Sequence, residues 1–176
     1  NKKGVSVCVT QEPGGTAVGK QIRQLLLEPR ETPLVPLAEL LLFQANRAQH
    51  VVQTIRPALE KGQVVLCDRF TDASIAYQGG ARGVANETVE GLNQMATEGL
   101  SPDLTFLLDL SPEETQERIA NRLREVGTDQ ARFDMEALEF HQAVRKSYLT
   151  IAVREADRFC VVETSSRSIE QLHEEI

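Results

Sequence analysis

The 176-residue sequence has no tryptophan, few aromatic residues (5%) and only three cysteines. Cys8, Cys67 and Cys160 are far apart, each lies within an apolar run, and none belongs to a Cys-x-x-Cys pair. This spacing argues against a disulfide framework and against a cysteine-based metal site. We therefore expect buried, reduced thiols and assign no metal-ligating residue.

The sequence also lacks long apolar runs and an excess of positive charge. No run approaches the roughly 18 apolar residues of a membrane span, and no signal-peptide core follows the first residues, NKKG. The formal net charge is -7, whereas proteins that bind long nucleic acids present clustered positive charge. We expect a soluble cytoplasmic protein with no membrane or long nucleic-acid partner, in which local arginines hold any anionic ligand.

Four short apolar runs predict β-strands. They are continuous rather than alternating, which is typical of strands covered on both faces. The stretches between them show helical spacing, including a long candidate helix from Pro36 to Lys61. Because strands that alternate with helices favour a parallel sheet, the sequence predicts an α/β fold with three α/β/α layers, as one domain over residues 1–176. The four runs are Val5–Val9, Gln63–Cys67, Leu104–Leu110 and Phe159–Glu163.

The stretch TQEPGGTAVGKQIRQLL, residues 10–26, matches the phosphate-binding loop pattern G-x-x-x-x-G-K-[ST] except at its last place. Gln21 stands where that loop needs a hydroxyl group for magnesium. Gly19 and Lys20 also fall within a helical spacing that continues to Leu26. We therefore interpret Lys20 as an exposed residue near the start of a helix rather than as part of a phosphate loop.

Polar residues follow the predicted strands, where parallel sheets bind their ligands. Asp68 and Arg69 come directly after one strand, and a guanidinium can bind phosphate with two parallel hydrogen bonds. The alternative is a salt bridge between them that ties the strand to the next helix. Phe43 and Arg47 are four residues apart and share one helix face, either as ligand contacts or as a core ring beside a solvated arginine.

Four consecutive motifs, which together span essentially the whole chain, resemble those of bacterial thymidylate kinases, members of the P-loop nucleoside monophosphate kinase family. The resemblance implies transfer of the γ-phosphoryl group of ATP to dTMP, with Mg2+, giving dTDP and ADP, by a homodimeric enzyme of dTTP biosynthesis. The motifs are EPGGT (12–16), LLFQANRAQH (41–50), DRFTDASIAYQG (68–79) and RFDMEALEFHQAVRKSYL (132–149).

That family has a strand, a P-loop and a helix before the EPGGT motif, and we expect this unit to be missing from the given chain. The resemblance places the missing strand at the centre of the sheet, between the runs at Gln63 and Leu104. We therefore expect a gap of about 10 Å, with unpaired backbone groups on both sides, and a chain that is inactive alone. Two alternatives remain: a nucleoside monophosphate kinase of other base specificity, which Phe43, Arg47 and Tyr77 disfavour, and a non-catalytic nucleotide-binding fragment.

The resemblance also assigns residues to a dTMP site. Arg69 would bind the acceptor phosphate, and Asp68 would orient it or reach Mg2+ through water. Phe43 would stack on thymine, Arg47 would donate a hydrogen bond to its O4, and Tyr77 would crowd a 2'-hydroxyl group. The full set of expected substrate-binding residues is Glu12, Pro13, Gly14, Phe43, Arg47, Asp68, Arg69, Ser74, Tyr77 and Gln78.

Arginines in the second half of the chain resemble the lid that closes over the ATP phosphates in this family, at about residues 118–133. Arg118, Arg122 and Arg124 are the expected ATP-binding residues, and Arg69, Arg118, Arg122 and Arg132 are the expected catalytic residues. Two positions depart from the family pattern. Gln11 replaces an arginine that commonly precedes EPGGT, and Ala131 replaces an aspartate that commonly precedes Arg-Phe. We assign no chemistry to His50, His141 or His173.

Overall fold

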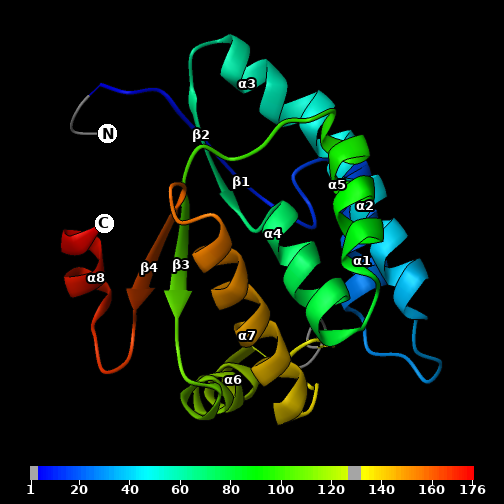
Figure 1. The fold of residues 1–176 in the computed structure, drawn as a ribbon, viewed down its shortest axis with the longest axis vertical. Coiled ribbons are helices and arrows are strands. Elements are labelled where there is room, and N and C mark those ends of the chain that lie inside the picture. The colour runs from blue at the N-terminus through cyan, green and yellow to red at the C-terminus, as the bar shows by residue number, and fades with distance from the viewer. Residues whose placement is uncertain (1–3, 127–131) are drawn as a thin grey trace.

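The computed structural model describes residues 4–126 and 132–176, and its strands form two parallel pairs (Figure 1). β1 (Val7–Gln11) pairs with β2 (Val64–Asp68), and β3 (Thr105–Asp109) pairs with β4 (Phe159–Glu163). Within the described residues no backbone ladder joins β2 to β3, so the strands form two separate two-stranded sheets. The break lies between β2 and β3, where the family resemblance implies a gap.

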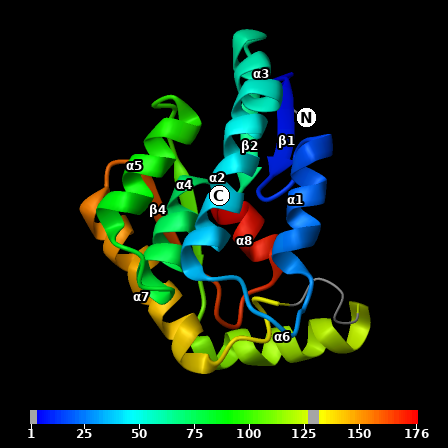
Figure 2. The same ribbon diagram turned by 90° about the vertical axis from the view of Figure 1, so that its right-hand side faces the viewer.

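Helices account for most of the remaining chain, and α6 crosses beyond the carboxyl end of β3 (Figures 1 and 2). The long helical stretch expected at residues 36–61 is present, as α2 and α3 joined by a π-helical turn at Val51–Ile55. A second π-helical turn, Ile75–Ala81, continues α4. The α-helices are α1 (Ala17–Leu27), α2 (Pro36–His50), α3 (Arg56–Glu60), α4 (Thr71–Ser74), α5 (Asn86–Thr97), α6 (Pro112–Val126), α7 (Leu138–Arg154) and α8 (Ile169–Glu175).

The start of α1 settles how the glycine-rich stretch folds. Thr16 is the N-cap residue, and its side-chain oxygen accepts a hydrogen bond from the backbone nitrogen of Gly19 at 2.9 Å. Such a cap satisfies one of the free backbone donors of the first helical turn. Gly19 and Lys20 therefore lie inside α1, and Lys20 is exposed. This confirms that the glycine pattern does not form a phosphate-binding loop.

One face of the strands is open in the described part of the chain. Alternate residues of β1, β2 and β3 are apolar and exposed, with 78% of Val9, 55% of Leu66 and 56% of Leu108 accessible. Cys160 on β4 is exposed as well. The expectations that both strand faces are covered and that all three thiols are buried are therefore wrong for the described residues. Continuous apolar runs still require a second covering layer, because exposed patches of this kind are unfavourable in water.

The opposite face packs against helices and holds the two strand pairs together. Leu40, Ile75, Val89 and Ile151 form a buried apolar cluster from α2, α5, α7 and the second π-helical turn. The Asp72 carboxylate, only 5% exposed, accepts hydrogen bonds from both terminal nitrogens of Arg158, at 2.6 and 2.9 Å. This ion pair fixes α4 against the β3–β4 pair. Among the described residues, no helix has the length and apolar character needed to cross a bilayer.

Candidate functional site

A cavity of about 140 Å³ lies beside the carboxyl ends of β1 and β2 and unites most of the predicted substrate-binding residues. Its walls come from the loop after β1, from α1 and α2, from the segment after β2 and from the segment before α7. Pro13, Gly14 and Asp68 do not line it. Seven predicted residues do: Glu12, Phe43, Arg47, Arg69, Ser74, Tyr77 and Gln78. Sequence reasoning missed the other five, which are Arg23, Leu27, Ala73, Phe133 and Asp134.

Helix α2 supplies one wall through residues four positions apart. Glu39, Phe43 and Arg47 lie along a single helix face because this spacing brings successive side chains above one another. The Phe43 ring is half-buried and lies 6.1 Å from the ring of Phe133, centroid to centroid. An aromatic face therefore lies between an acidic side chain and a basic one.

Arg47 is 1% exposed, which excludes the alternative of a solvated arginine. A buried guanidinium is stable only when most of its N–H groups are paired. Here Nε and Nη1 have acceptors for all their N–H groups, whereas Nη2, with two N–H groups, has one acceptor among the described residues. The pairing holds Arg47 rigid at the cavity wall. Its hydrogen-bond acceptors are Glu12 Oε2 (2.9 Å), Gln44 Oε1 (3.1 Å), Ser74 Oγ (3.0 Å), Asn93 Oδ1 (2.6 Å) and the Phe70 carbonyl (2.9 Å).

His50, to which the sequence assigns no chemistry, is fully buried and holds the loop after β1 in place. Its Nδ1 lies 2.9 Å from Glu12 Oε1, and its Nε2 lies 2.6 Å from the Thr10 hydroxyl. Asn46, from the same helix, accepts a hydrogen bond from the backbone nitrogen of Gly14 at 2.8 Å. The motifs EPGGT and NRAQH are therefore one structural unit, in which α2 fixes the position of the Glu12 carboxylate.

We expect Gly15→Ala to destabilise the protein by about 2–4 kcal/mol, because two costs combine. The backbone φ of Gly15 is +76°, and an added Cβ would lie 2.5 Å from the His50 ring. The matched control is Gly62→Ala, where φ is +70° but nothing lies within 4 Å, so only backbone strain of about 1 kcal/mol applies. Urea denaturation compares the two variants, and equal losses would contradict the role of the His50 contact.

Two arginines meet at another part of the cavity. Arg69, just after β2, has a left-handed backbone (φ 64°), a conformation that costs a non-glycine residue about 1–3 kcal/mol and is often found at functional sites. Its guanidinium lies over the ring of Tyr77, at 5.0 Å. Burial and the charge of Arg69 together lower the pKa of Arg23. Two guanidiniums that repel each other in one cavity form a site that an anion would stabilise.

Arg23 could have been suspected from the sequence, because α1 begins directly after the glycine-rich turn and carries an arginine two turns in. Its terminal nitrogen donates a hydrogen bond to the carbonyl of Pro13 at 2.9 Å. The turn and the arginine are thus directly connected. This position in α1 is the one sequence signal for Arg23, and only the shared cavity with Arg69 separates it from other helical arginines.

The expected lid arginines are not brought together in the described residues. Arg118 donates to the carbonyl of Thr164 after β4, at 3.1 Å, and Arg124 is exposed and contacts Asn121. The side chain of Arg122 and residues 127–131 lie outside the described part of the chain. The structure thus leaves only Arg118 and Arg124 as described candidates on α6.

Arg132 does not line the cavity, but it directly precedes Phe133, which does. Its Nη2 is 2.8 Å from Glu39 Oε2, its Nε donates to the carbonyl of Leu26 at 2.5 Å, and its guanidinium lies 4.2 Å from the Phe133 ring centroid. These contacts connect Arg132 to α1, to α2 and to the aromatic wall of the cavity. The catalytic role expected for Arg132 stays a prediction.

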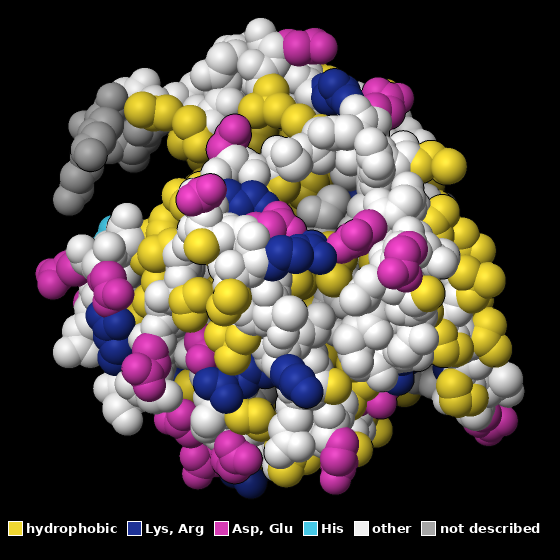
Figure 3. Space-filling model, in the orientation of Figure 1, with side chains coloured by type: hydrophobic (Ala, Val, Ile, Leu, Met, Phe, Trp, Pro, Cys, Tyr) yellow, Lys and Arg dark blue, Asp and Glu magenta, His cyan; other side chains and the backbone are white. Residues whose placement is uncertain are grey.

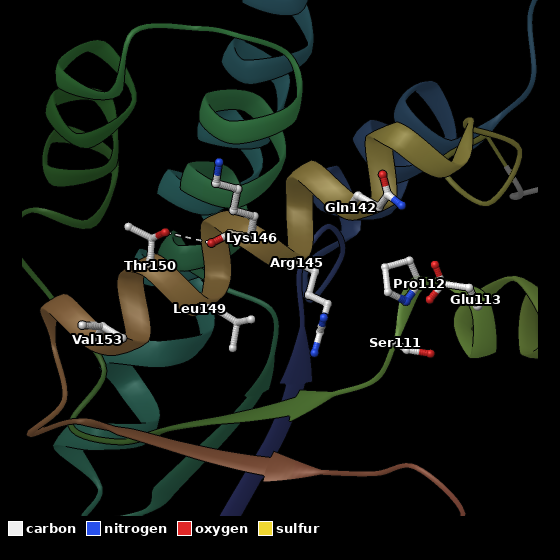
Figure 4. A pocket seen from close by; sticks show the side chains of 9 residues that line it. All are labelled: Ser111, Pro112, Glu113, Gln142, Arg145, Lys146, Leu149, Thr150 and Val153. Atoms are coloured by element: carbon white, nitrogen blue, oxygen red, sulfur yellow. Dashed lines mark hydrogen bonds between the residues drawn. The ribbon is translucent and has the colours of Figure 1, made fainter.

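A second, wider groove of about 680 Å³ runs between α7 and the start of α6 (Figure 4). None of the predicted site residues lines it. Arg145, which points from α7 toward the end of β3, forms two hydrogen bonds with Asp109, each 2.7 Å long. The bonds to Asp109 raise the pKa of Arg145, and the pair anchors α7 to β3. The arginine is therefore already neutralised by a structural partner.

The cavity beside β1 and β2 combines paired guanidiniums, an aromatic ring and fixed polar groups at the carboxyl ends of parallel strands. These features define a nucleotide-binding α/β protein. The sequence profile of the thymidylate kinase family matches residues 1–176. The chain therefore belongs to the thymidylate kinase family, whose members are phosphotransferases.

Similar proteins support this assignment. The chain is 50% identical to a thymidylate kinase of Desulfovibrio desulfuricans over 165 residues, which cover 93% of this chain and 76% of that protein. It is 47% identical to a thymidylate kinase of Pelobacter propionicus, with 98% and 79% covered. The crystal structure of thymidylate kinase from Ehrlichia chaffeensis superimposes with a TM-score of 0.73 at 32% identity, covering 97% of this chain and 77% of that one. The three-layer α/β/α nucleotide kinase fold is thereby confirmed.

Proposed function

We propose that this protein transfers the γ-phosphoryl group of ATP to dTMP, giving dTDP and ADP, and that the 140 Å³ cavity binds dTMP. The observation that carries the proposal is one cavity that holds both an arginine pair and an aromatic wall with fixed polar groups. Arg23 and Arg69 suit a phosphate, while Phe43 and Arg47 suit a base. A mononucleotide carries both groups at opposite ends.

The proposed chemistry places little demand on acid–base groups. A phosphate oxygen of dTMP attacks the γ-phosphorus of ATP, and the bond to the bridging oxygen breaks, so that its electron pair leaves with ADP. The attacking phosphate is already ionised, and no general base is needed. The rate then depends on alignment and on neutralisation of charge. Arg69 and Arg23 would hold the acceptor phosphate, and Arg118, Arg122 and Arg124 would neutralise the ATP phosphates.

At the base end, the Phe43 ring offers a stacking surface and Arg47 a positively charged donor near O4 of thymine. Each stacking contact with a base contributes roughly 1–3 kcal/mol. Tyr77, whose ring packs against Phe133 at 5.5 Å, would fill the space that a ribose 2'-hydroxyl requires. These contacts favour a thymine deoxynucleotide over the alternative of a kinase with another base preference.

Mg2+ would accompany ATP, and the end of β2 can accept it. Asp68 is exposed there, next to Arg69, and Mg2+ is commonly bound through one or two carboxylates, waters and substrate phosphates rather than by a protein cage. In the described ranges no three His, Cys, Asp or Glu side chains cluster as a metal site. Asp68 would therefore hold the ion only together with the nucleotide, and the ion would neutralise phosphate charge.

ATP binding needs a phosphate-binding loop. We propose that this loop follows a strand that lies between β2 and β3. Each of these strands has an unpaired edge in the described residues, and the exposed apolar face beside them needs a cover. A strand, loop and helix seated there would satisfy both. Kinase activity that appears only when such a unit is present would support this; activity of residues 1–176 alone would contradict it.

We propose in addition that the enzyme is a cytoplasmic homodimer. Leu37 and Leu41 on α2 and Val52 in the turn that follows are about half exposed, and they lie on the side of the helix away from the cavity residues. Sedimentation of the wild type and of Leu41→Glu tests the dimer, and an equal mass for the two proteins would contradict it.

Figure 3 shows basic and acidic side chains interspersed on the viewed face, which suits a small anionic ligand better than a long nucleic acid.

Calorimetry with dTMP, dCMP and UMP tests the binding proposal, and release of ADP in the presence of ATP tests the catalytic one. We expect dTMP to bind most tightly. Preference for another nucleotide would support a kinase of other base specificity. Binding of dTMP without turnover, in a protein that carries the phosphate-binding loop, would leave only a nucleotide-binding role.

A further inference from the structure

Glu39 lies on the same face of α2 as the cavity residues Phe43 and Arg47, and it is 0% exposed. A buried carboxylate is costly unless cations and donors pair with it. Here Arg132 Nη2 lies 2.8 Å from Oε2, and Arg82 Nε donates to Oε1 at 3.3 Å. Two guanidiniums therefore pair with the Glu39 carboxylate. Glu39 does not stand out in the sequence, because Arg82 and Arg132 are distant from it along the chain.

The third partner of Glu39 is Gln78, and this contact fixes the orientation of an amide. Gln78 Nε2 donates to Glu39 Oε1 at 2.8 Å, and the Gln78 side chain is 1% exposed. An ionised carboxylate accepts hydrogen bonds and cannot donate them, so the NH2 end of the amide must face Glu39. The carbonyl end then points the other way. Gln78 lines the cavity, and no described residue donates to its Oε1.

The cavity therefore presents an acceptor from Gln78 and a donor from Arg47. The edge of thymine offers the matching pair, because O4 accepts and N3–H donates. Cytosine reverses both groups, since its 4-amino group donates and its N3 accepts. With cytosine bound, the Arg47 donor would face the 4-amino donor and the Gln78 acceptor would face the N3 acceptor. Both hydrogen bonds would then be lost, so the site would strongly favour thymine over cytosine.

We propose that Glu39 is a positioning residue that sets base specificity by locking the Gln78 carbonyl toward the cavity. This proposal rests on the proposed function, because it takes the cavity as the thymine site. Glu39 does not touch the base. It acts through Gln78, because its carboxylate accepts the hydrogen bond that orients the Gln78 amide.

Glu39→Gln tests the lock. An amide at position 39 can donate as well as accept, so the Gln78 amide can turn and present NH2 to the cavity. We expect the ratio of dissociation constants for dCMP and dTMP to fall about tenfold or more, because dTMP loses a hydrogen bond and dCMP gains one. Calorimetry with both nucleotides measures the ratio directly.

The matched control is Arg82→Gln. Arg82 also pairs with Glu39 and with Glu136, so its loss lowers stability, but the carboxylate remains and still admits only the NH2 end of Gln78. We expect a lower Tm with an unchanged nucleotide ratio. A merely structural role for Glu39 predicts the same ratio in both variants, and that result would overturn the proposal.

A rescue variant gives an independent check. Glu39→Gln combined with Gln78→Glu exchanges the two groups, so the amide at 39 donates to the carboxylate at 78, whose second oxygen faces the cavity. We expect this double variant to recover preference for dTMP relative to Glu39→Gln alone; failure to recover it counts against the proposal.

If position 39 tolerates no substitution, a comparison of the wild type with Gln78→Leu still tests whether the Gln78 carbonyl faces the base. The wild type should bind N3-methyl-dTMP at least about tenfold more weakly than dTMP, and Gln78→Leu should lose most of that difference. Equal differences in both proteins would overturn the proposal. A wild type that shows no preference for dTMP over dCMP would instead contradict the proposed function itself.

Discussion

Replacing Arg69 with alanine is expected to lower kcat/KM for dTMP phosphorylation about 10²- to 10³-fold, equivalent to roughly 3–4 kcal/mol of transition-state stabilisation. Arg69 lies at the end of β2 in a strained left-handed backbone, with its guanidinium packed over Tyr77. The substitution removes one of two charges in the proposed phosphate site and leaves the acceptor poorly aligned. A coupled assay of ADP release measures the loss, in an enzyme that carries the phosphate-binding loop.

Three further variants test whether the loss of activity is specific to Arg69. Lys20→Ala removes the lysine of the glycine-rich pattern, which is exposed on α1, and should leave kcat/KM within about twofold. Arg23→Ala should weaken dTMP binding, and the double variant with Arg69→Ala should deviate from additivity because the two charges interact. Activity of Arg69→Ala within threefold of the parent would refute the assignment of Arg69.

The sequence predicts the elements and part of the site for physical reasons, while Glu12, Ser74, Tyr77 and Gln78 were expected only from the family resemblance. Apolar runs and helix spacing depend on neighbours within a few positions, so β1 to β4 and the long helix from residue 36 could be located. The positions of Phe43 and Arg47 on one face follow from helix geometry alone. Gly19 and Lys20 were placed in a helix for the same reason, and the cap at Thr16 confirms it.

Contacts between distant segments could not be predicted in this way. Glu39 looks like an ordinary polar residue in a first helical turn, until Gln78 and Arg132 approach it from other segments. His50 has no signal of its own, since its partners Thr10 and Glu12 lie on β1 and the loop after it. Such residues are buried polar groups whose partners decide their role.

The continuous apolar runs were informative about the sheet, although the expectation that both strand faces are covered was wrong for the described residues. Val9 and Leu66 point to an open face, although their runs are typical of strands covered on both sides. The sequence was thus consistent with a layer that the described residues do not supply. This is the same region in which β2 and β3 fail to pair.

The largest effect on stability is expected for Arg47→Met, which should lower the free energy of unfolding by about 3–5 kcal/mol. Methionine fills much of the volume but leaves the Glu12 carboxylate without one of its two partners and several acceptors without a donor. For a domain of this size the loss corresponds to a decrease in Tm of about 10 °C. Chemical denaturation followed by circular dichroism gives the free energy.

Arg56→Met is the matched control. Arg56 lies nine positions further along the same helical stretch, but its side chain is 36% exposed and its partner Glu98 is 66% exposed. An exposed ion pair contributes only about 0–1 kcal/mol. Arg56 also donates to the carbonyls of Thr97 and Glu98, at 3.2 and 3.3 Å, so this variant should lose some stability but clearly less than Arg47→Met. Similar losses in the two variants would show that the buried network around Arg47 is not what stabilises the cavity.

Arg47→Met also separates the contribution of Arg47 to stability from its contribution to base recognition. If Arg47 also donates to O4 of thymine, folded Arg47→Met protein should discriminate less between dTMP and dCMP, whereas Phe43→Ala should weaken both nucleotides similarly, because every base offers a face for stacking. Calorimetry below the unfolding temperature of each variant measures both nucleotides. An unchanged dTMP:dCMP ratio in Arg47→Met would confine Arg47 to holding the cavity wall, and base reading would then rest on Gln78.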